Sequence, residues 1–370
     1  MRPIEIPGNI ARIHPYVPGK PIEELERELG LKGSVKLASN ENPLGPSPHA
    51  IAALKGATVD LNRYPDGAGF RLKQRLGEIN RLSPDRIMLG NGSSDLVEIF
   101  ARTFLGADGN AVIADQAFIM YRLAVMAVNG NTRIVPLRDN VHDLRAMSDA
   151  VDDATRLIYI ANPNNPTGTY VTHDDLVELL DRVGDRALVV VDEAYREYVV
   201  APDYPDTLDL LKRNRRLAVL RTFSKIHGLA GVRIGYALAA PDVLEAAERV
   251  RSPFNTSSLA QAAALGALVD DAHVARTRDH NRVELRFVQE RLSQMGISFI
   301  PSVANFVLVD TGMDCDTIFD ALLRQGVIVR PMKAYDFPTS LRVTMGTRAE
   351  NEAFLAALGK ALEVHKSMTL

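Results

Sequence analysis

The sequence predicts an α/β protein in which a large, mostly parallel sheet carries helices on both faces and a smaller α+β unit follows. Three observations support this prediction. Between residues 70 and 240, short strands that are apolar throughout alternate with helical stretches, which is typical of a parallel sheet buried on both faces. Polar clusters follow several of these strands directly. From about residue 257, a long helix-rich span replaces the alternation.

The N-terminal residues precede this alternation. Residues 13–20 are rich in Pro and Gly, and a short helix is expected to begin near Pro21 and end at Gly30. Turn-forming residues fill 38–48 and 62–67, so both stretches are predicted as loops.

The remaining elements follow from apolar runs and helical stretches. The predicted strands of the large sheet are 87–89, 111–113, 133–135, 157–160, 187–191, 217–220 and 234–238. Helices are expected at 69–80, from the turn 90–95 to about 105, at 118–129 and at 172–183. The helix-rich span 257–295 ends at Gly296, a plausible C-cap. The smaller unit should contain strands near 299, 306–309, 327–329 and 341–344 and helices at 315–324 and 349–366.

Composition narrows the class of protein. The 370 residues are 46% hydrophobic and 24% charged, and a net charge of −3 gives no reason to expect a nucleic acid or an anionic membrane as partner. A single cysteine, Cys315, excludes an internal disulfide framework and fits a reducing compartment. No signal-peptide core and no membrane-spanning apolar run are visible, so a cytoplasmic protein is expected. The histidines lack the spacing of a metal site, so no metal is expected.

Four polar clusters follow apolar strands and indicate one binding site. They are the turn 92–95, Asn165, Asp192 with Tyr195, and residues 222–225. In an open parallel sheet, ligands bind outside the carboxyl ends of the strands, so these clusters should meet at one edge.

Lys225 is the candidate nucleophile of this site. A buried lysine must be paired or neutralised, and a neutral amine commonly forms a Schiff base with an aldehyde. Thr222, Ser224 and Arg233 suit a phosphate on that aldehyde. The turn that contains Ser93 and Ser94 opens a helix and can bind phosphate through backbone N–H groups, but it matches neither a dinucleotide fingerprint nor a Walker loop.

The other candidates suit an aromatic ring. Asp192 needs a cationic partner and would fit a pyridinium N–H, although it is equally suited to cap a helix. Asn165 and Tyr195 could donate to a ring oxygen. Phe118 could lie on the ring face or belong to the core, and Tyr16 could be a lid or a packing residue.

The order of these motifs resembles the fold-type I pyridoxal-phosphate aminotransferases of classes I and II. Residues 162–168 (NPNNPTG) and 222–236 (TFSKIHGLAGVRIGY) carry the resemblance. Residues 14–19, 39–48 and 63–66 are similar to the histidinol-phosphate aminotransferases within that superfamily, and the resemblance extends from about residue 10 to the end.

The resemblance implies a fold, a cofactor and residue roles. It implies a seven-stranded, mostly parallel sheet in a large cofactor-binding domain, 41–270, a small α+β domain, 271–370, and an arm, 1–40, that packs on the small domain and on a partner subunit. Lys225 would bind pyridoxal 5′-phosphate covalently and move a proton between the substrate and the cofactor. The residues expected to contact the ring are Asp192, Asn165, Tyr195 and Phe118, and those expected to contact the phosphate are Ser93, Ser94, Thr222, Ser224 and Arg233.

The resemblance also implies a homodimer and a substrate site. Tyr64 would reach the cofactor phosphate of the neighbouring subunit. Arg342 would bind the acidic end of the substrate, Arg330 and Tyr16 would hold a substrate phosphate, and Asn165 would also contact the substrate. Two departures are visible: Phe118 stands where that branch often has Tyr, and the turn at Ser93, Ser94 and Asp95 differs from the commoner sequence.

Several functions remain open at this point. The first is transamination of L-histidinol phosphate with 2-oxoglutarate, a step of histidine biosynthesis. Others are an aromatic amino-acid aminotransferase and, on the same scaffold, decarboxylation of an O-phospho amino acid. A nucleotide-binding or regulatory protein on an open α/β sheet is disfavoured by Lys225 and by the absence of a Walker or dinucleotide loop.

Overall fold

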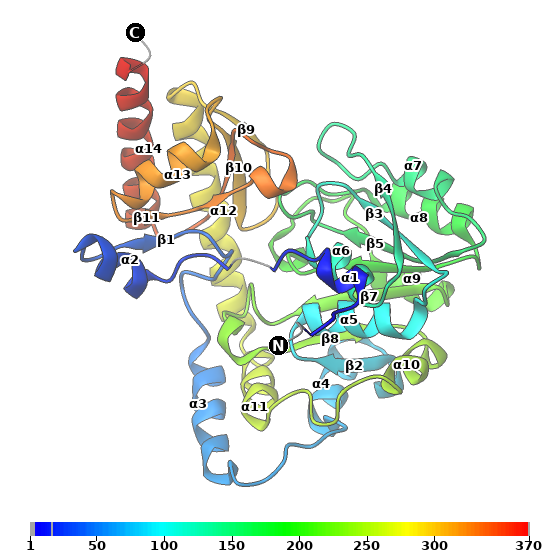
Figure 1. Cartoon of the computed structure of the whole chain (residues 1–370). Helices are drawn as coiled ribbons and strands as arrows, with labels where there is room; N and C mark the ends of the chain where they lie inside the picture. Colours follow the sequence, from blue (N-terminus) through cyan, green and yellow to red (C-terminus); the bar gives the residue numbers. More distant parts are fainter. Residues whose placement is uncertain (1–3, 16–17, 369–370) are drawn as a thin grey trace.

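The computed structural model describes residues 4–15 and 18–368 and contains a large seven-stranded sheet and a smaller four-stranded one. Helices surround the large sheet, and the C-terminal helices pack with the smaller sheet (Figure 1). This arrangement confirms the predicted α/β fold with a mostly parallel sheet.

The large sheet has the strand order β2-β8-β7-β6-β5-β3-β4. Its strands are β2 (Ile87–Gly90), β3 (Asn110–Ala114), β4 (Asn131–Val135), β5 (Thr155–Ala161), β6 (Leu188–Asp192), β7 (Leu217–Thr222) and β8 (Gly235–Leu238). β8 runs antiparallel to both of its neighbours, β2 and β7, and the other neighbouring strands are parallel to each other. The central strands β6 and β7 are buried along their whole length, as expected for apolar runs covered on both faces, whereas the edge strand β4 exposes several residues.

Helices before, between and after the strands cover the two faces of this sheet (Figure 1). They are α4 (Phe70–Asn80), α5 (Ser93–Phe104), α6 (Met120–Ala127), α7 (Leu144–Asp149), α8 (His173–Val183), α9 (Thr207–Arg213), α10 (Pro241–Glu248) and α11 (Ser258–Ala267). Each of these helices places buried apolar residues in the core around the sheet. The core fixes the strand ends, where the functional side chains lie.

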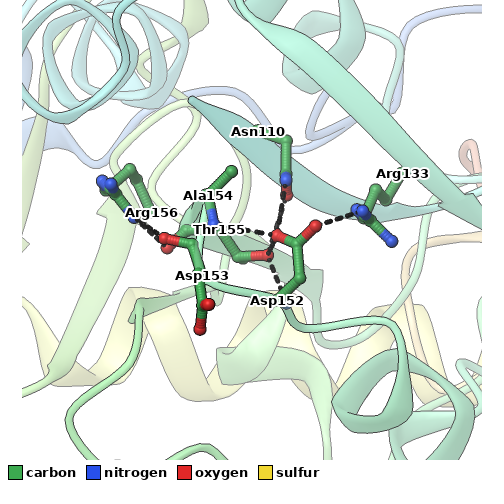
Figure 2. Close-up of polar contacts among 7 residues, drawn as sticks. All are labelled: Asn110, Arg133, Asp152, Asp153, Ala154, Thr155 and Arg156. Atoms are coloured by element: carbon green, nitrogen blue, oxygen red, sulfur yellow. Dashed lines mark hydrogen bonds and ion pairs between the residues drawn. The ribbon is translucent and has the colours of Figure 1, made fainter. Parts of the chain in front are cut away.

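A polar cluster joins the amino ends of β3 and β5 to the middle of β4 (Figure 2). The carboxylate of Asp152 accepts hydrogen bonds from Nδ2 of Asn110 (2.9 Å), the backbone N–H of Ala154 (3.1 Å) and Oγ1 of Thr155 (2.9 Å). It also pairs with the guanidinium of Arg133 on β4. The strand starts are therefore held together by groups that the chain itself supplies.

The C-terminal part has its own sheet and core. The sheet has the order β12-β13-β10-β9, and its strands are β9 (Ser298–Ile300), β10 (Phe306–Asp310), β12 (Arg330–Pro331) and β13 (Ser340–Thr344). Its helices are α12 (Asp271–Gln294), α13 (Cys315–Leu323) and α14 (Arg348–Met368). Cys315, at the start of α13, is fully buried in this second core.

The N-terminal segment contacts both parts. Strand β1 (Val35–Lys36) pairs in parallel with β11 (Val327–Ile328) next to the C-terminal core. The preceding helices are α1 (Gly8–Ala11), which lies beside α6, and α2 (Ile22–Leu29), which lies near β1 (Figure 1).

The sequence prediction missed several helices. Residues 48–56 follow a run of turn formers, yet they form α3 (Pro48–Gly56), because Ser47 caps it, proline suits its first turn and α11 packs against it. The short helices α7, α9 and α10 were missed as well. Each has fewer than nine residues, which is too short for a clear periodic pattern.

Candidate active site

A cavity of about 260 Å³ lies at the carboxyl ends of the central strands. Most of the predicted site residues line it: Ser93, Ser94, Phe118, Asn165, Asp192, Tyr195, Thr222, Ser224, Lys225, Arg233 and Arg342. The four polar clusters therefore meet at the carboxyl ends of the strands, as expected from the sequence.

Asp192 ends β6 and is 5% exposed. Its carboxylate accepts hydrogen bonds from Oη of Tyr121 (3.0 Å) and from the backbone N–H of Ala194 (3.1 Å). Burial raises the pKa of Asp192 to about 6, although both hydrogen bonds oppose this shift. A buried carboxylate that receives only neutral donors is suited to bind a cationic N–H of a ligand.

Lys225 lies in the loop after β7, and its amine donates a hydrogen bond to the carbonyl of Ser39 (3.1 Å). Its Nζ is 5.6 Å from the centroid of the Tyr195 ring. Burial lowers the pKa of Lys225 to about 7, and the positive charges of Arg342 and Arg233 act in the same direction. A large fraction of the amine is therefore neutral near pH 7, as a nucleophilic lysine requires.

A cradle of donors surrounds the N-terminus of α5. Gly92 precedes this helix with a φ of +81°, and a Cβ atom built on it would lie 2.3 Å from Nη2 of Arg233. Glycine thus allows the guanidinium to approach the helix end. Nη1 of Arg233 donates to Oγ of Ser224 (3.3 Å), and Oγ1 of Thr222 donates to the same oxygen (3.0 Å). Helix N–H groups, hydroxyls and a guanidinium together suit a phosphate group.

Arg342 on β13 brings the C-terminal part to the cavity. Its Nη1 donates to Oδ1 of Asn165 (2.6 Å), and its Nη2 donates to the carbonyl of Ala38 (2.7 Å). Arg342 is 7% exposed. A buried guanidinium in a ligand cavity is suited to bind a carboxylate.

Tyr195 and Phe118 complete the walls. Oη of Tyr195 accepts a hydrogen bond from Nδ2 of Asn40 (2.9 Å), and burial raises the pKa of Tyr195 to about 12, so the phenol keeps its proton. Phe118 packs edge-on against Tyr121, with ring centroids 5.7 Å apart. Tyr121 in turn stacks on Tyr159 at 5.0 Å.

Sequence reasoning missed four residues with polar side chains that line the cavity. They are Ser39, Asn40, Glu41 and Tyr121. In the predicted helix 118–129, the spacing of three residues places Phe118 and Tyr121 on one face, although α6 itself begins only at Met120. The first three lie in the stretch 39–48, whose resemblance to a known family was visible without roles for its side chains.

Three predicted residues are not in this cavity. Tyr64 is 83% exposed, stacks on Phe254 at 4.7 Å, and lines a neighbouring cavity together with Arg233. Arg330 on β12 lies directly opposite Arg342 in the smaller sheet, outside the cavity lining. Tyr16 lies outside the described residues.

Residues 4–15 and 18–368, which the structure describes, offer neither a metal-binding cluster nor a membrane-spanning helix. They contain no cluster of three or more His, Cys, Asp or Glu side chains that could hold a metal ion. None of their helices combines the length and apolarity needed to cross a bilayer.

The donor set fits an aromatic aldehyde that carries a phosphate. An amine with a lowered pKa, a buried carboxylate and a phosphate cradle line one cavity together with Asn165, Tyr195 and Arg342. Such a set can bind the aldehyde covalently, keep a ring nitrogen protonated and hold a carboxylate of a second ligand.

The comparisons with known proteins agree with this chemistry. The family model for aminotransferases of class I and II matches residues 32–358. A histidinol-phosphate aminotransferase from Pseudomonas fluorescens is 48% identical over 358 residues, which cover 96% of each chain. One from Anaeromyxobacter sp. is 48% identical over 364 residues, which cover 96% of this chain and 99% of the relative.

A solved structure is also similar. The crystal structure of histidinol-phosphate aminotransferase from Sinorhizobium meliloti in complex with pyridoxal-5′-phosphate has a TM-score of 0.90 at 29% identity. The match covers 97% of this chain and 98% of that chain.

Proposed function

Because the chain belongs to the class I and II aminotransferases, we propose that it transfers the amino group of L-histidinol phosphate to 2-oxoglutarate with pyridoxal 5′-phosphate as cofactor. The products would be imidazole-acetol phosphate and glutamate, a step of histidine biosynthesis. The observation that carries the proposal is the pairing, in one cavity, of a lysine with a lowered pKa and a buried carboxylate.

The cofactor, when bound, supplies an electron sink that makes the substrate's α-carbon acidic. In the proposal, the amine of Lys225 would hold the cofactor through a covalent bond and would serve as the group that carries the proton of the substrate's α-carbon. Asp192 would keep the ring nitrogen protonated, and Asn165 and Tyr195 would donate to the ring oxygen. Phe118 would cover one ring face.

The phosphate cradle would hold the cofactor at its other end. The residues assigned to it are Ser93, Ser94, Thr222, Ser224 and Arg233. Because these donors are fixed by β7, β8 and α5 before the cofactor arrives, little ordering is needed for binding.

The substrate site and the assembly are part of the same proposal. Arg342 would bind the carboxylate of 2-oxoglutarate, and Arg330 with Tyr16 would hold the phosphate of histidinol phosphate. The enzyme would be a cytoplasmic homodimer in which Tyr64, which is exposed in one chain, reaches the cofactor phosphate of the partner subunit. Its domains would be an arm, 1–40, a large domain, 41–270, and a small domain, 271–370.

The test is turnover of histidinol phosphate and of phenylalanine by the purified protein loaded with pyridoxal 5′-phosphate. Arg330→Ala should lower turnover of the phosphorylated substrate by roughly 10- to 100-fold, the value of a charge-assisted hydrogen bond, and should affect phenylalanine far less. Arg324→Ala, which removes an exposed arginine nearby, is the control. Equal losses on both substrates would favour an aromatic amino-acid aminotransferase instead.

A further inference from the structure

Residues 37–40 connect the smaller sheet with the cavity and form hydrogen bonds with residues of both. The carbonyls of Ala38 and Ser39 accept the hydrogen bonds of Arg342 and Lys225 described above. Segment 37–40 is therefore connected through its backbone to two side chains of the site.

Asn40 ends this segment and uses its side chain as well. It is 1% exposed and has a φ of +54°. Its backbone N–H donates to Oγ1 of Thr344 (2.9 Å), the Thr344 hydroxyl donates to Oδ1 (3.1 Å), and Nδ2 donates to Oη of Tyr195 (2.9 Å). Its carbonyl accepts a hydrogen bond from Nδ2 of Asn305 (3.1 Å).

Thr344 fixes which way the Asn40 amide points. In the observed orientation, the hydroxyl hydrogen of Thr344 has Oδ1 as its acceptor. The reverse orientation would turn the NH₂ group toward Thr344, whose hydrogen would then lose this acceptor, although the residue is only 3% exposed. The NH₂ group is thereby held against Tyr195.

This contact determines what the hydroxyl of Tyr195 does. An amide NH₂ group can only donate, so Oη of Tyr195 acts as acceptor toward Asn40 and its own hydrogen must be used elsewhere. Tyr195 lines the cavity, and the raised pKa keeps the hydroxyl protonated. Its hydrogen is therefore available to an acceptor inside the cavity.

We propose that Asn40 is a positioning residue that, by donating to Tyr195, directs the Tyr195 hydroxyl hydrogen onto the ring oxygen of the bound cofactor. This proposal rests on the proposed function, because it requires pyridoxal 5′-phosphate in the cavity. A donor to the ring oxygen stabilises negative charge on that oxygen. The lysine-bound cofactor then loses its proton more easily, so its pKa is lower. Asn40 should therefore keep the pKa of the lysine-bound cofactor low.

The other charged or titratable groups around Tyr195 act differently. Lys225 lies over its ring, and Arg342, Asp192 and Tyr335 influence it through their charge. Charge alone does not select the direction of a hydroxyl hydrogen, whereas a fixed donor does.

The experiment follows the visible absorption of the lysine-bound cofactor as a function of pH. In Asn40→Gly the pKa should rise by on the order of one unit, the value of a hydrogen bond to a charged acceptor. Glycine accepts the positive φ, so the backbone is not strained. Asn129→Gly, at an exposed residue with a φ of +58°, makes the same change far from the site and should leave the pKa unchanged.

Two further variants keep the test decisive if Asn40→Gly does not fold. Asn40→Asp replaces the donor by an acceptor, so the Tyr195 hydrogen turns away from the cavity and the rise should exceed that of glycine. Thr344→Val removes the group that fixes the amide and should give a smaller rise.

Tyr195→Phe separates positioning from a general disturbance of the site. In that background Asn40→Gly should add no further shift, because the hydroxyl through which it acts is gone. An unchanged pKa in Asn40→Gly, or an equal shift in the Tyr195→Phe background, would overturn the positioning role while the aminotransferase stands. A wild-type protein with no lysine-bound chromophore would overturn the proposed function and this role with it.

Discussion

Asp152 lies at the amino ends of the strands of the large sheet and Asp192 at their carboxyl ends, and the two carboxyl groups differ in pKa. At the amino edge, the hydrogen bond from Asn110, together with further donors and Arg133, lowers the pKa of Asp152 (Figure 2). At the carboxyl edge, burial raises the pKa of Asp192 to about 6. One carboxylate is surrounded by donors from its own chain, including a cation, and the other receives only two neutral ones.

The contrast separates a structural carboxylate from one prepared for a ligand. The carboxylate of Asp152 already accepts several hydrogen bonds and an ion pair, so it stabilises the contact of three strands and has no need of a ligand. Asp192 is held in its charged form at a cost that a cationic ligand group can offset. The chain itself therefore stabilises the charged form of Asp152, whereas the charged form of Asp192 lacks such stabilisation until a ligand binds. Four variants examine this contrast and the site around Asp192.

Loss of Lys225 should have the largest effect. Lys225→Ala removes the amine that binds the cofactor, so transamination should fall by roughly 10⁴-fold or more, since both covalent binding and proton transfer are lost. Borohydride reduction followed by mass spectrometry should find the cofactor on Lys225 in the wild type and on no residue in the variant. Lys212→Ala, at an exposed position of α9, should retain activity. Normal turnover by Lys225→Ala would refute the nucleophile.

Asp192→Asn should lower turnover by roughly 100-fold or more, because a neutral amide cannot keep the ring nitrogen protonated.

The same substitution should make the cofactor-free protein more stable. Since the folded pKa of Asp192 is raised, the folded state binds more protons than the unfolded state between about pH 4 and pH 6, so wild-type stability falls as pH rises through that window. The variant lacks this loss, and its Tm at pH 7 should be higher by a few degrees. A lower Tm at pH 7 would contradict the contrast.

Gly92→Ala tests the phosphate cradle. Its Cβ would displace the guanidinium of Arg233, so the affinity for pyridoxal 5′-phosphate should fall by roughly 10- to 100-fold. Gly30→Ala is the matched control, because Gly30 has a φ of +66° and open space around it. Both variants carry the cost of a positive φ, on the order of 1–3 kcal/mol, and the cost is larger at Gly92, whose ψ of 170° is adopted essentially by glycine alone, than at Gly30, whose ψ is 25°. Equal cofactor affinities, measured by fluorescence titration, would show that the cradle does not depend on the approach of Arg233.

Asp152→Asn should have the smallest effect on function and a modest effect on stability. Activity should be unchanged, and the Tm should fall by on the order of a few degrees at pH 7. Because the folded pKa of Asp152 is lowered, its contribution is present above about pH 4 and is lost as the pH falls through the folded value. The difference in Tm between wild type and variant should therefore vanish in acid. A difference that persists there would assign the effect to packing.

The sequence was sufficient to predict that the polar residues following apolar strands would meet in one cavity. Asp192 and the residues around Lys225 come directly after strands β6 and β7, and the geometry of a parallel sheet brings such positions to one edge. Asn40 could not be assigned in this way. Its partners Tyr195 and Thr344 are 155 and 304 positions away, and no local pattern reports such contacts.

Helix α3 and Arg330 illustrate two other limits. The helix depends on its packing against α11, which overrides a sequence full of turn formers. Arg330 was assigned from a motif, and its position opposite Arg342 on the smaller sheet reflects a strand register that residue types alone do not fix.

The burial of Cys315 has a practical consequence. It is the single thiol of the chain, it is fully buried in the C-terminal core, and burial raises its pKa. Alkylating reagents attack the thiolate, so labelling must wait until that core opens. The labelling rate of Cys315 would thus report how often the C-terminal core opens, independently of the visible absorption of the bound cofactor, which reports on the active site.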